Sequence, residues 1–111
     1  MKLDSLSQTD KILILSRIAH TLTVCARSTY EPKTENILEP KVLRAYNELL
    51  HQVTASIAGH VTNDKHYAPL EAIIQMMHDF GRQHDREKEI TWALQFVETR
   101  HFPHPVEYKL T

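Results

Sequence analysis

Two short pairs of glutamate and histidine are residues that could carry chemistry in this chain of 111 residues. Glu48 stands three positions before His51, and Glu98 stands three positions before His101. Residues three apart share one face of a helix, so the carboxylate and the imidazole of each pair could bind the same metal ion. A metal site at these four residues is therefore one hypothesis that the sequence offers.

This arrangement resembles the ligand pattern of ferritin-like di-iron proteins, in which two helices of a four-helix bundle each supply a Glu-x-x-His pair. The resemblance implies one further carboxylate from each remaining helix. Here the first helix has only Asp10, at its start, and the third has Glu71 and Asp79 outside its apolar stripe. We therefore expect no cofactor, and the metal-binding bundle remains an alternative.

A second pattern joins an arginine to a histidine two helical turns later. The stretch from Arg44 to His51 resembles the arginine, six residues, histidine motif of HEPN-type ribonucleases, which are small helical proteins and usually dimers. The resemblance implies that Arg44 holds a phosphate and that His51 moves a proton at the ribose hydroxyl. Metal-independent RNA cleavage is therefore the enzymatic alternative, although the sequence shows no basic patch around the pair.

A third pattern surrounds His20 on the first helix. The string Ala19-His20-Thr21-Leu22 is similar to the phosphoacceptor helix of histidine phosphotransfer domains, which implies that His20 carries a phosphate. That family has a lysine and a glycine where this chain has Thr23 and Val24. The valine side chain would crowd an approaching response regulator, where a glycine would not.

Composition limits the other classes of function. Lys and Arg number 13 against 14 Asp and Glu, so the formal net charge is −1 and no basic field for DNA is expected. The chain has two glycines, which disfavours a glycine-rich phosphate loop. Cys25 is the only cysteine, which suits a reducing compartment. The longest purely apolar run, Ile12 to Leu15, is too short to span a bilayer, and no signal-peptide pattern opens the chain, so we expect a cytoplasmic protein.

Apolar periodicity predicts an all-α, single-domain, four-helix protein over residues 1–111. The first two helices should form a long hairpin, with the two shorter helices packed across it. Residues 90–97 also alternate as a strand would, but a lone strand has nothing to pair with, so a helix is favoured. The expected helices cover about 7–29, 40–60, 68–80 and 86–100, and an extended tail covers 102–111.

Residues at the helix ends support these boundaries. Ser7 suits the N-cap of the first helix, and Asp85 suits the N-cap of the fourth. Proline fits a first helical turn, which places Pro40 and Pro69 at helix starts, and glycine fits the position after a helix, which places Gly81 at a helix end. The inward stripe of the second helix should consist of Leu43, Tyr46, Leu50, Val53, Ile57 and Val61, and Ile37 and Leu38 should anchor the preceding loop on the core.

Apolar residues remain after each helix has received one inward stripe, and they suggest a contact surface. A bundle of this size cannot cover two sides of several helices, and apolar edges rimmed by Arg and His are typical of partner surfaces. We expect a regulatory or accessory homodimer that acts by protein–protein contact, without membrane or DNA partners. The expected interaction surface consists of Leu13, Arg17, His20, Val24, Trp92 and Phe96.

Overall fold

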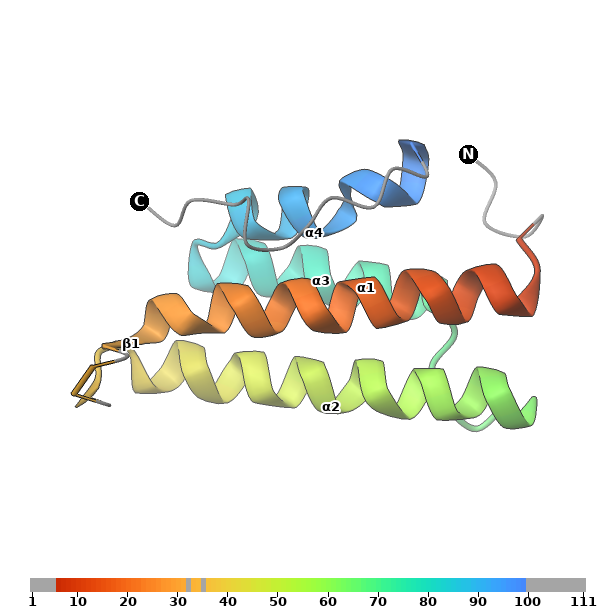
Figure 1. Cartoon of the computed structure of the whole chain (residues 1–111), viewed down its shortest axis with the longest axis horizontal. Coiled ribbons are helices and arrows are strands. Elements are labelled where there is room, and N and C mark those ends of the chain that lie inside the picture. Colours follow the sequence, from red (N-terminus) through yellow and green to blue (C-terminus); the bar gives the residue numbers. More distant parts are fainter. Residues whose placement is uncertain (1–5, 32, 35, 100–111) are drawn as a thin grey trace.

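The computed structural model describes residues 6–31, 33–34 and 36–99, and this part of the chain contains four α-helices (Figure 1). A 3-10 turn and two short strands connect the first two helices, and no helix among the described residues is long and apolar enough to cross a membrane. The elements are α1 (Gln8–Ala26), the 3-10 turn (Arg27–Thr29), β1 (Tyr30–Glu31), β2 (Asn36–Ile37), α2 (Pro40–Thr62), α3 (Leu70–His84) and α4 (Glu87–Thr99).

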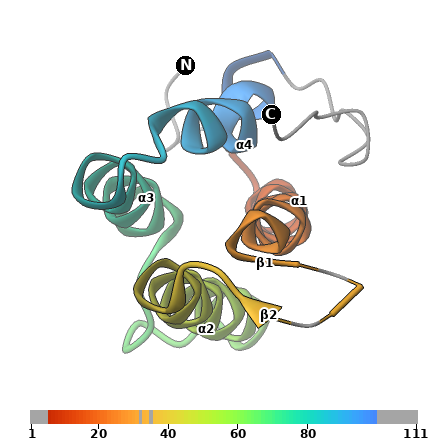
Figure 2. The same cartoon turned by 90° about the vertical axis from the view of Figure 1, so that its left-hand side faces the viewer.

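The four helices surround a common centre in the view of Figure 2, and their buried side chains form one hydrophobic core. α1 packs along α2 as a long hairpin, α3 lies beside α2, and α4 contacts both α3 and α1. The expected all-α fold, with two shorter helices packed on a long hairpin, is therefore confirmed, and residues 90–97 are helical. The core includes the fully buried side chains of Ile14, Leu15, Ile18, Leu22, Tyr46, Val53, Leu70, Ile73, Met77 and Ile90.

The starts of α1 and α2 follow the sequence prediction. The Ser7 hydroxyl accepts a hydrogen bond from the amide of Asp10 at 3.1 Å, which satisfies one free N–H of the first turn. Pro40 is the first residue of α2. The expected tail and the last residue of the predicted fourth helix lie outside the described residues.

The prediction for the end of the third helix is wrong. α3 continues through Gly81 to His84, and Asp85 ends it in the left-handed conformation with a φ of 56°. Asp85 therefore caps the C-terminus of α3 and not the N-terminus of α4. A Cβ at Gly81 would lie 3.1 Å from Cγ1 of Ile90, so this glycine serves the close approach of α4 to α3.

Backbone hydrogen bonds hold the α1–α2 connection together. The carbonyl of Thr29 accepts the amides of Leu38 and Glu39 at 2.7 and 3.0 Å, and β1 pairs with β2 in an antiparallel register. Ile37 and Leu38 are 53% and 62% exposed, so the expectation that they anchor the loop on the core is wrong. The backbone here is held by the pairing of β1 with β2 at Ile37 and by the Thr29 carbonyl at Leu38, so neither side chain has to enter the core.

One ion pair links the start of α4 to the start of α2. The guanidinium of Arg86 donates to the carboxylate of Glu39, and 16% of the arginine side chain is exposed. Burial alone would lower the pKa of Arg86, but the hydrogen bond and the charge of Glu39 raise that pKa above its usual value. Arg86 therefore stays charged, and its ion pair with Glu39 fixes where α4 begins relative to the hairpin.

We expect Gly59→Ala to destabilise the fold. Gly59 is buried in α2, and an added Cβ would lie 2.6 Å from Cβ of Tyr67, which cannot move without its backbone. The clash should outweigh the gain in helix propensity of about 1 kcal/mol and lower the free energy of unfolding by about 1–3 kcal/mol. Thermal unfolding followed by circular dichroism measures this change, and a variant that melts higher than the wild type would contradict the close packing.

Candidate functional site

The outer side of the α1–α2 hairpin presents a surface without charged side chains, called here the uncharged face. Ala45, Leu49 and Gln52 line the α3 side of α2, so the residues on the opposite flank of α2 face outward beside α1. On α1 the row continues from Gln8, which bonds to His60 of α2. The uncharged face consists of Ile12, Ser16, Ala19, Thr23, Leu43, Leu50, Thr54, Ile57 and Val61, all of them exposed or partly exposed.

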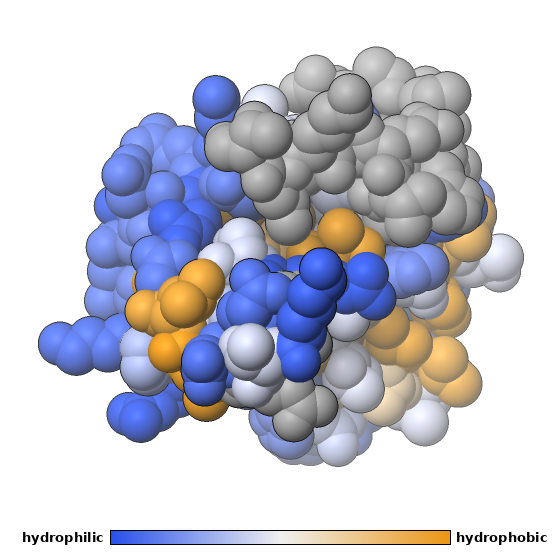
Figure 3. Space-filling view, turned by 60° about the vertical axis from the view of Figure 1, so that its left-hand side comes forward, coloured by the Kyte–Doolittle hydropathy of each residue, from blue (hydrophilic) through white to orange (hydrophobic). Residues whose placement is uncertain are grey.

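The hydroxyl groups on the uncharged face are already satisfied. Ser16, Thr23 and Thr54 each donate to the backbone carbonyl one turn earlier in their own helix, at 2.8, 2.8 and 2.9 Å. Covering a hydroxyl that keeps its hydrogen bond costs far less than covering one that would lose a bond to water. Hydrophobic residues gather on this side of the molecule, toward the lower right of Figure 3.

The second helix does not bury its whole apolar stripe. Tyr46 and Val53 have no exposed area, Leu50 and Ile57 are partly exposed, and Val61 is 66% exposed. The assignment of all six stripe residues to the interior is therefore wrong for Val61. Regular spacing could have indicated the uncharged face, but spacing alone does not say where a buried stripe ends and a contact surface begins.

The six residues of the expected interaction surface have mixed exposure. Leu13 is 46% exposed and His20 is also exposed, whereas Val24 is only 8% exposed. Trp92 is partly buried against the core and Arg17 is partly exposed, while the side chain of Phe96 lies outside the described residues. Val24 and Trp92 can add little area to a contact, and this surface stays a prediction.

An open groove of about 660 Å³ runs between α2 and α3. Arg44 and His51 both line it, as their two-turn spacing implied, and α3 contributes His84 to the same lining. The floor is apolar, with Leu49 and Phe80 among its residues. The groove thus brings one arginine and two histidines to a single surface.

Acidic groups compensate the charge of this groove. Glu48 and Asp79 line it together with Arg44, so the potential there is not strongly positive. Within residues 6–99 as described, no three His, Cys, Asp or Glu side chains come close enough to share a metal ion. Glu48 and His51 form the described half of the alternative metal site, whose other half, the Glu98 side chain and His101, lies outside the described residues.

Cys25 is a core residue, as its place in the apolar stripe predicted. It has no exposed area, and burial, followed by the charge of Glu89, raises the pKa of its thiol to about 12. The thiol therefore stays protonated at neutral pH and is a poor nucleophile.

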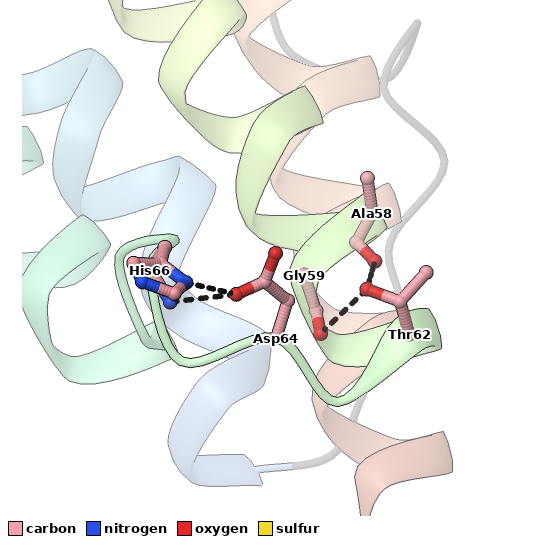
Figure 4. Close-up of polar contacts among 5 residues, drawn as sticks. All are labelled: Ala58, Gly59, Thr62, Asp64 and His66. Atoms are coloured by element: carbon pink, nitrogen blue, oxygen red, sulfur yellow. Dashed lines mark hydrogen bonds and ion pairs between the residues drawn. The ribbon is translucent and has the colours of Figure 1, made fainter.

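The α2–α3 connection folds over the end of α2 and forms a pocket of about 320 Å³, called here the end pocket. Figure 4 shows this connection, in which Oδ1 of Asp64 accepts hydrogen bonds from the backbone amide and Nδ1 of His66 at 2.9 and 2.7 Å. These bonds lower the pKa of Asp64 below its usual value. The lining consists of Gln8, Lys11, Ser56, Gly59, His60, Asn63, Asp64, Lys65, Tyr67, Ala68 and Pro69.

Gln8 ties the start of α1 to His60 on the wall of the end pocket. The Gln8 amide donates to the carbonyl of His60 at 3.4 Å, and its Oε1 lies 3.0 Å from Nδ1 of the same residue. The neutral ring therefore carries its proton on Nδ1, and the buried Nε2 has no hydrogen-bond partner among the described residues. Burial, and then the charge of Lys11, lower the pKa of His60, with a smaller opposing effect from Glu71.

No protein-family model matches this chain, and neither does any curated protein or solved structure. The uncharged face, the α2–α3 groove and the end pocket are therefore the features that indicate function.

We expect acid to weaken the fold through His60. Because the pKa of His60 is lower in the folded state than its ordinary value of 6.5, the unfolded chain takes up the proton first. Stability should therefore fall as the pH drops below about 6.5. His60→Gln removes this proton, so its melting temperature should fall less than that of the wild type between about pH 7.5 and about pH 5.5. Equal falls in both proteins would show that His60 is not the group responsible.

Proposed function

We propose that this protein acts by protein–protein contact, and that the uncharged face associates with a second copy of the same chain. The observation that carries the proposal is the absence of charge from nine neighbouring surface positions on α1 and α2. A regulatory or accessory protein of this kind works through the surface that it offers to a partner. The class of function is the one expected from the sequence, contact between proteins. The contact surface that we propose is the uncharged face of the α1–α2 hairpin, not the six residues expected from the sequence.

Symmetry favours a second copy as the partner. A two-fold dimer places the same surface on both sides of the interface, so any charged group near the axis would face its own copy. The uncharged face avoids this repulsion, and its partly exposed Leu43, Leu50 and Ile57 offer apolar area to be covered. Hydroxyl groups bonded to their own helix remain satisfied when the face is covered.

The size of the uncharged face also suits a weak dimer. The stretch from Leu43 to Val61 spans about 27 Å at the helical rise of about 1.5 Å per residue. Two helices at the usual spacing make this face about 18 Å wide, so each copy would bury roughly 500 Å². The total of roughly 1,000 Å² lies near the lower limit for specific interfaces, which fits a reversible association.

We expect Thr54→Glu to abolish the dimer and leave the fold intact. Thr54 is exposed in the uncharged face, and glutamate is a good helix former, so the change adds repulsion at the interface without touching the core. The matched control, Gln52→Glu, adds the same charge on the α3 side of α2. Light scattering at about 100 µM should give a dimer for the wild type and the control and a monomer for Thr54→Glu.

Two results would contradict this proposal. A wild-type protein that stays monomeric at that concentration would exclude self-association. A Thr54→Glu dimer as strong as the wild type would place the interface elsewhere on the molecule.

Ribonuclease action at Arg44 and His51 is the second candidate, because both residues line one groove with His84. Arginine would hold a phosphate and histidine would move the proton of the ribose hydroxyl. RNA cleavage in the presence of a metal chelator should then be lost in His51→Ala, and because His51 is exposed this substitution leaves the core untouched. A wild-type protein that leaves RNA intact would end this candidate without affecting the contact proposal.

A further inference from the structure

We infer that the end pocket binds a small phosphate-bearing anion, with Lys11 and Lys65 as its cationic ligands. This inference concerns a different part of the molecule from the uncharged face and does not depend on dimer formation. It follows from the balance of hydrogen-bond donors and acceptors that the pocket presents.

The two lysines are the unpaired cations of this pocket. Lys11 precedes the fully buried Leu15 and Ile18 by four and seven positions, so its side chain starts from the inward side of α1. Among the described residues, the ammonium groups of Lys11 and Lys65 form neither an ion pair nor a hydrogen bond. Two such groups around one pocket repel each other, and an anion between them would remove that repulsion.

Several backbone carbonyls near the pocket already accept hydrogen bonds from the chain itself. The carbonyl of Gly59 accepts the amides of Asn63 and Asp64, and the Thr62 hydroxyl donates to the carbonyl of Ala58 at 2.9 Å (Figure 4). The carbonyl of His60 accepts from the Gln8 amide. The carbonyls of Ala58, Gly59 and His60 at the C-terminal end of α2 therefore already accept hydrogen bonds within the chain.

Asp64 is the one carboxylate among the described lining residues, and His66 donates two hydrogen bonds to its Oδ1. The remaining charges are the two lysines, so the lining carries a net charge of +1 while His60 is neutral. The C-terminus of α2 lines the pocket through Gly59, His60 and Asn63 and adds negative potential, whereas the adjoining N-terminus of α3 has no side-chain cap and adds positive potential. Glu71 in the first turn of α3 offsets part of that potential, but it does not line the pocket.

The volume sets the size of the ligand. About 320 Å³ lies at the lower end of the range for small-molecule sites and is larger than a phosphate group requires. A phosphate monoester with a sugar-sized substituent therefore fits the pocket, with its phosphate between the lysines and its substituent near Tyr67 and Pro69. Inorganic phosphate and ribose 5-phosphate are the two probes that distinguish the free ion from the ester.

His60 supplies an independent readout of the anion. Burial is the main cause of the lowered pKa of His60 and the charge of Lys11 is the second, while Gln8 bonds to the ring and Glu71 acts in the opposite direction. An anion held by Lys11 would offset the lysine charge, and the pKa of His60 should then rise toward its ordinary value. A merely structural role of the lysines would not produce this ligand-dependent change.

The test is an NMR titration of the full chain with inorganic phosphate and with ribose 5-phosphate, against sodium chloride at equal ionic strength. We expect saturable shifts of amides around the pocket and a rise in the pKa of His60. Lys11→Gln and Lys65→Gln should each weaken binding by about tenfold. The matched control, Lys41→Gln, removes the same charge from an exposed position outside the pocket and should bind as the wild type does.

Saturation by both probes, or by the ester alone, supports the inference and states which form the pocket selects. Shifts that do not saturate, or equal weakening in Lys41→Gln, would mean general charge screening and would overturn it. The same titration of Thr54→Glu should give unchanged affinity, which separates this site from the proposed dimer.

Discussion

The packing of α1 against α2 is the interaction on which the rest of the structure depends. Its inner side supplies much of the core, its outer side is the uncharged face, and one of its ends forms a wall of the end pocket. The hairpin is fixed at both ends, by the Thr29 carbonyl that accepts two amides before α2 and by the pair of Gln8 and His60. A shift of one helix by a single turn would displace all three features together.

The same side chains connect stability with the proposed contact. Leu43, Leu50 and Ile57 each pack against the core and keep part of their surface in solvent. A second copy that covers this remaining area would extend the core outward and would not create a separate site. Oligomerisation of this kind stabilises the fold by mass action, so the stability of the chain should depend on its concentration.

Elements with strong local signals could be predicted from the sequence. The four helices follow from periodicity, Ser7 caps α1 as its residue type suggests, and Arg44 and His51 share a surface because seven residues make two turns. Gly81 could not be assigned correctly, because a glycine that admits a neighbouring helix and one that ends a helix look alike in a single sequence. The packing of α4 against Gly81 decides between these two roles.

The end pocket could not be predicted from the sequence, because it too depends on packing between distant elements. Lys11 and Lys65 line one pocket only because the start of α1 lies beside the end of α2, over which the α2–α3 connection folds, and no local pattern encodes that arrangement. The charge balance of the α2–α3 groove likewise depends on Asp79 and His84, which α3 brings opposite α2. Long-range packing therefore decides which candidate residues meet, while local sequence decides which elements carry them.

The most direct measurement of the central claim is a map of backbone amide shifts as the protein is diluted from about 500 µM to about 10 µM, a range that spans weak association. Our account predicts that the concentration-dependent shifts cluster on α1 between Ile12 and Thr23 and on α2 between Leu43 and Val61. Shifts confined to α3 and α4, or none at any concentration, would contradict it.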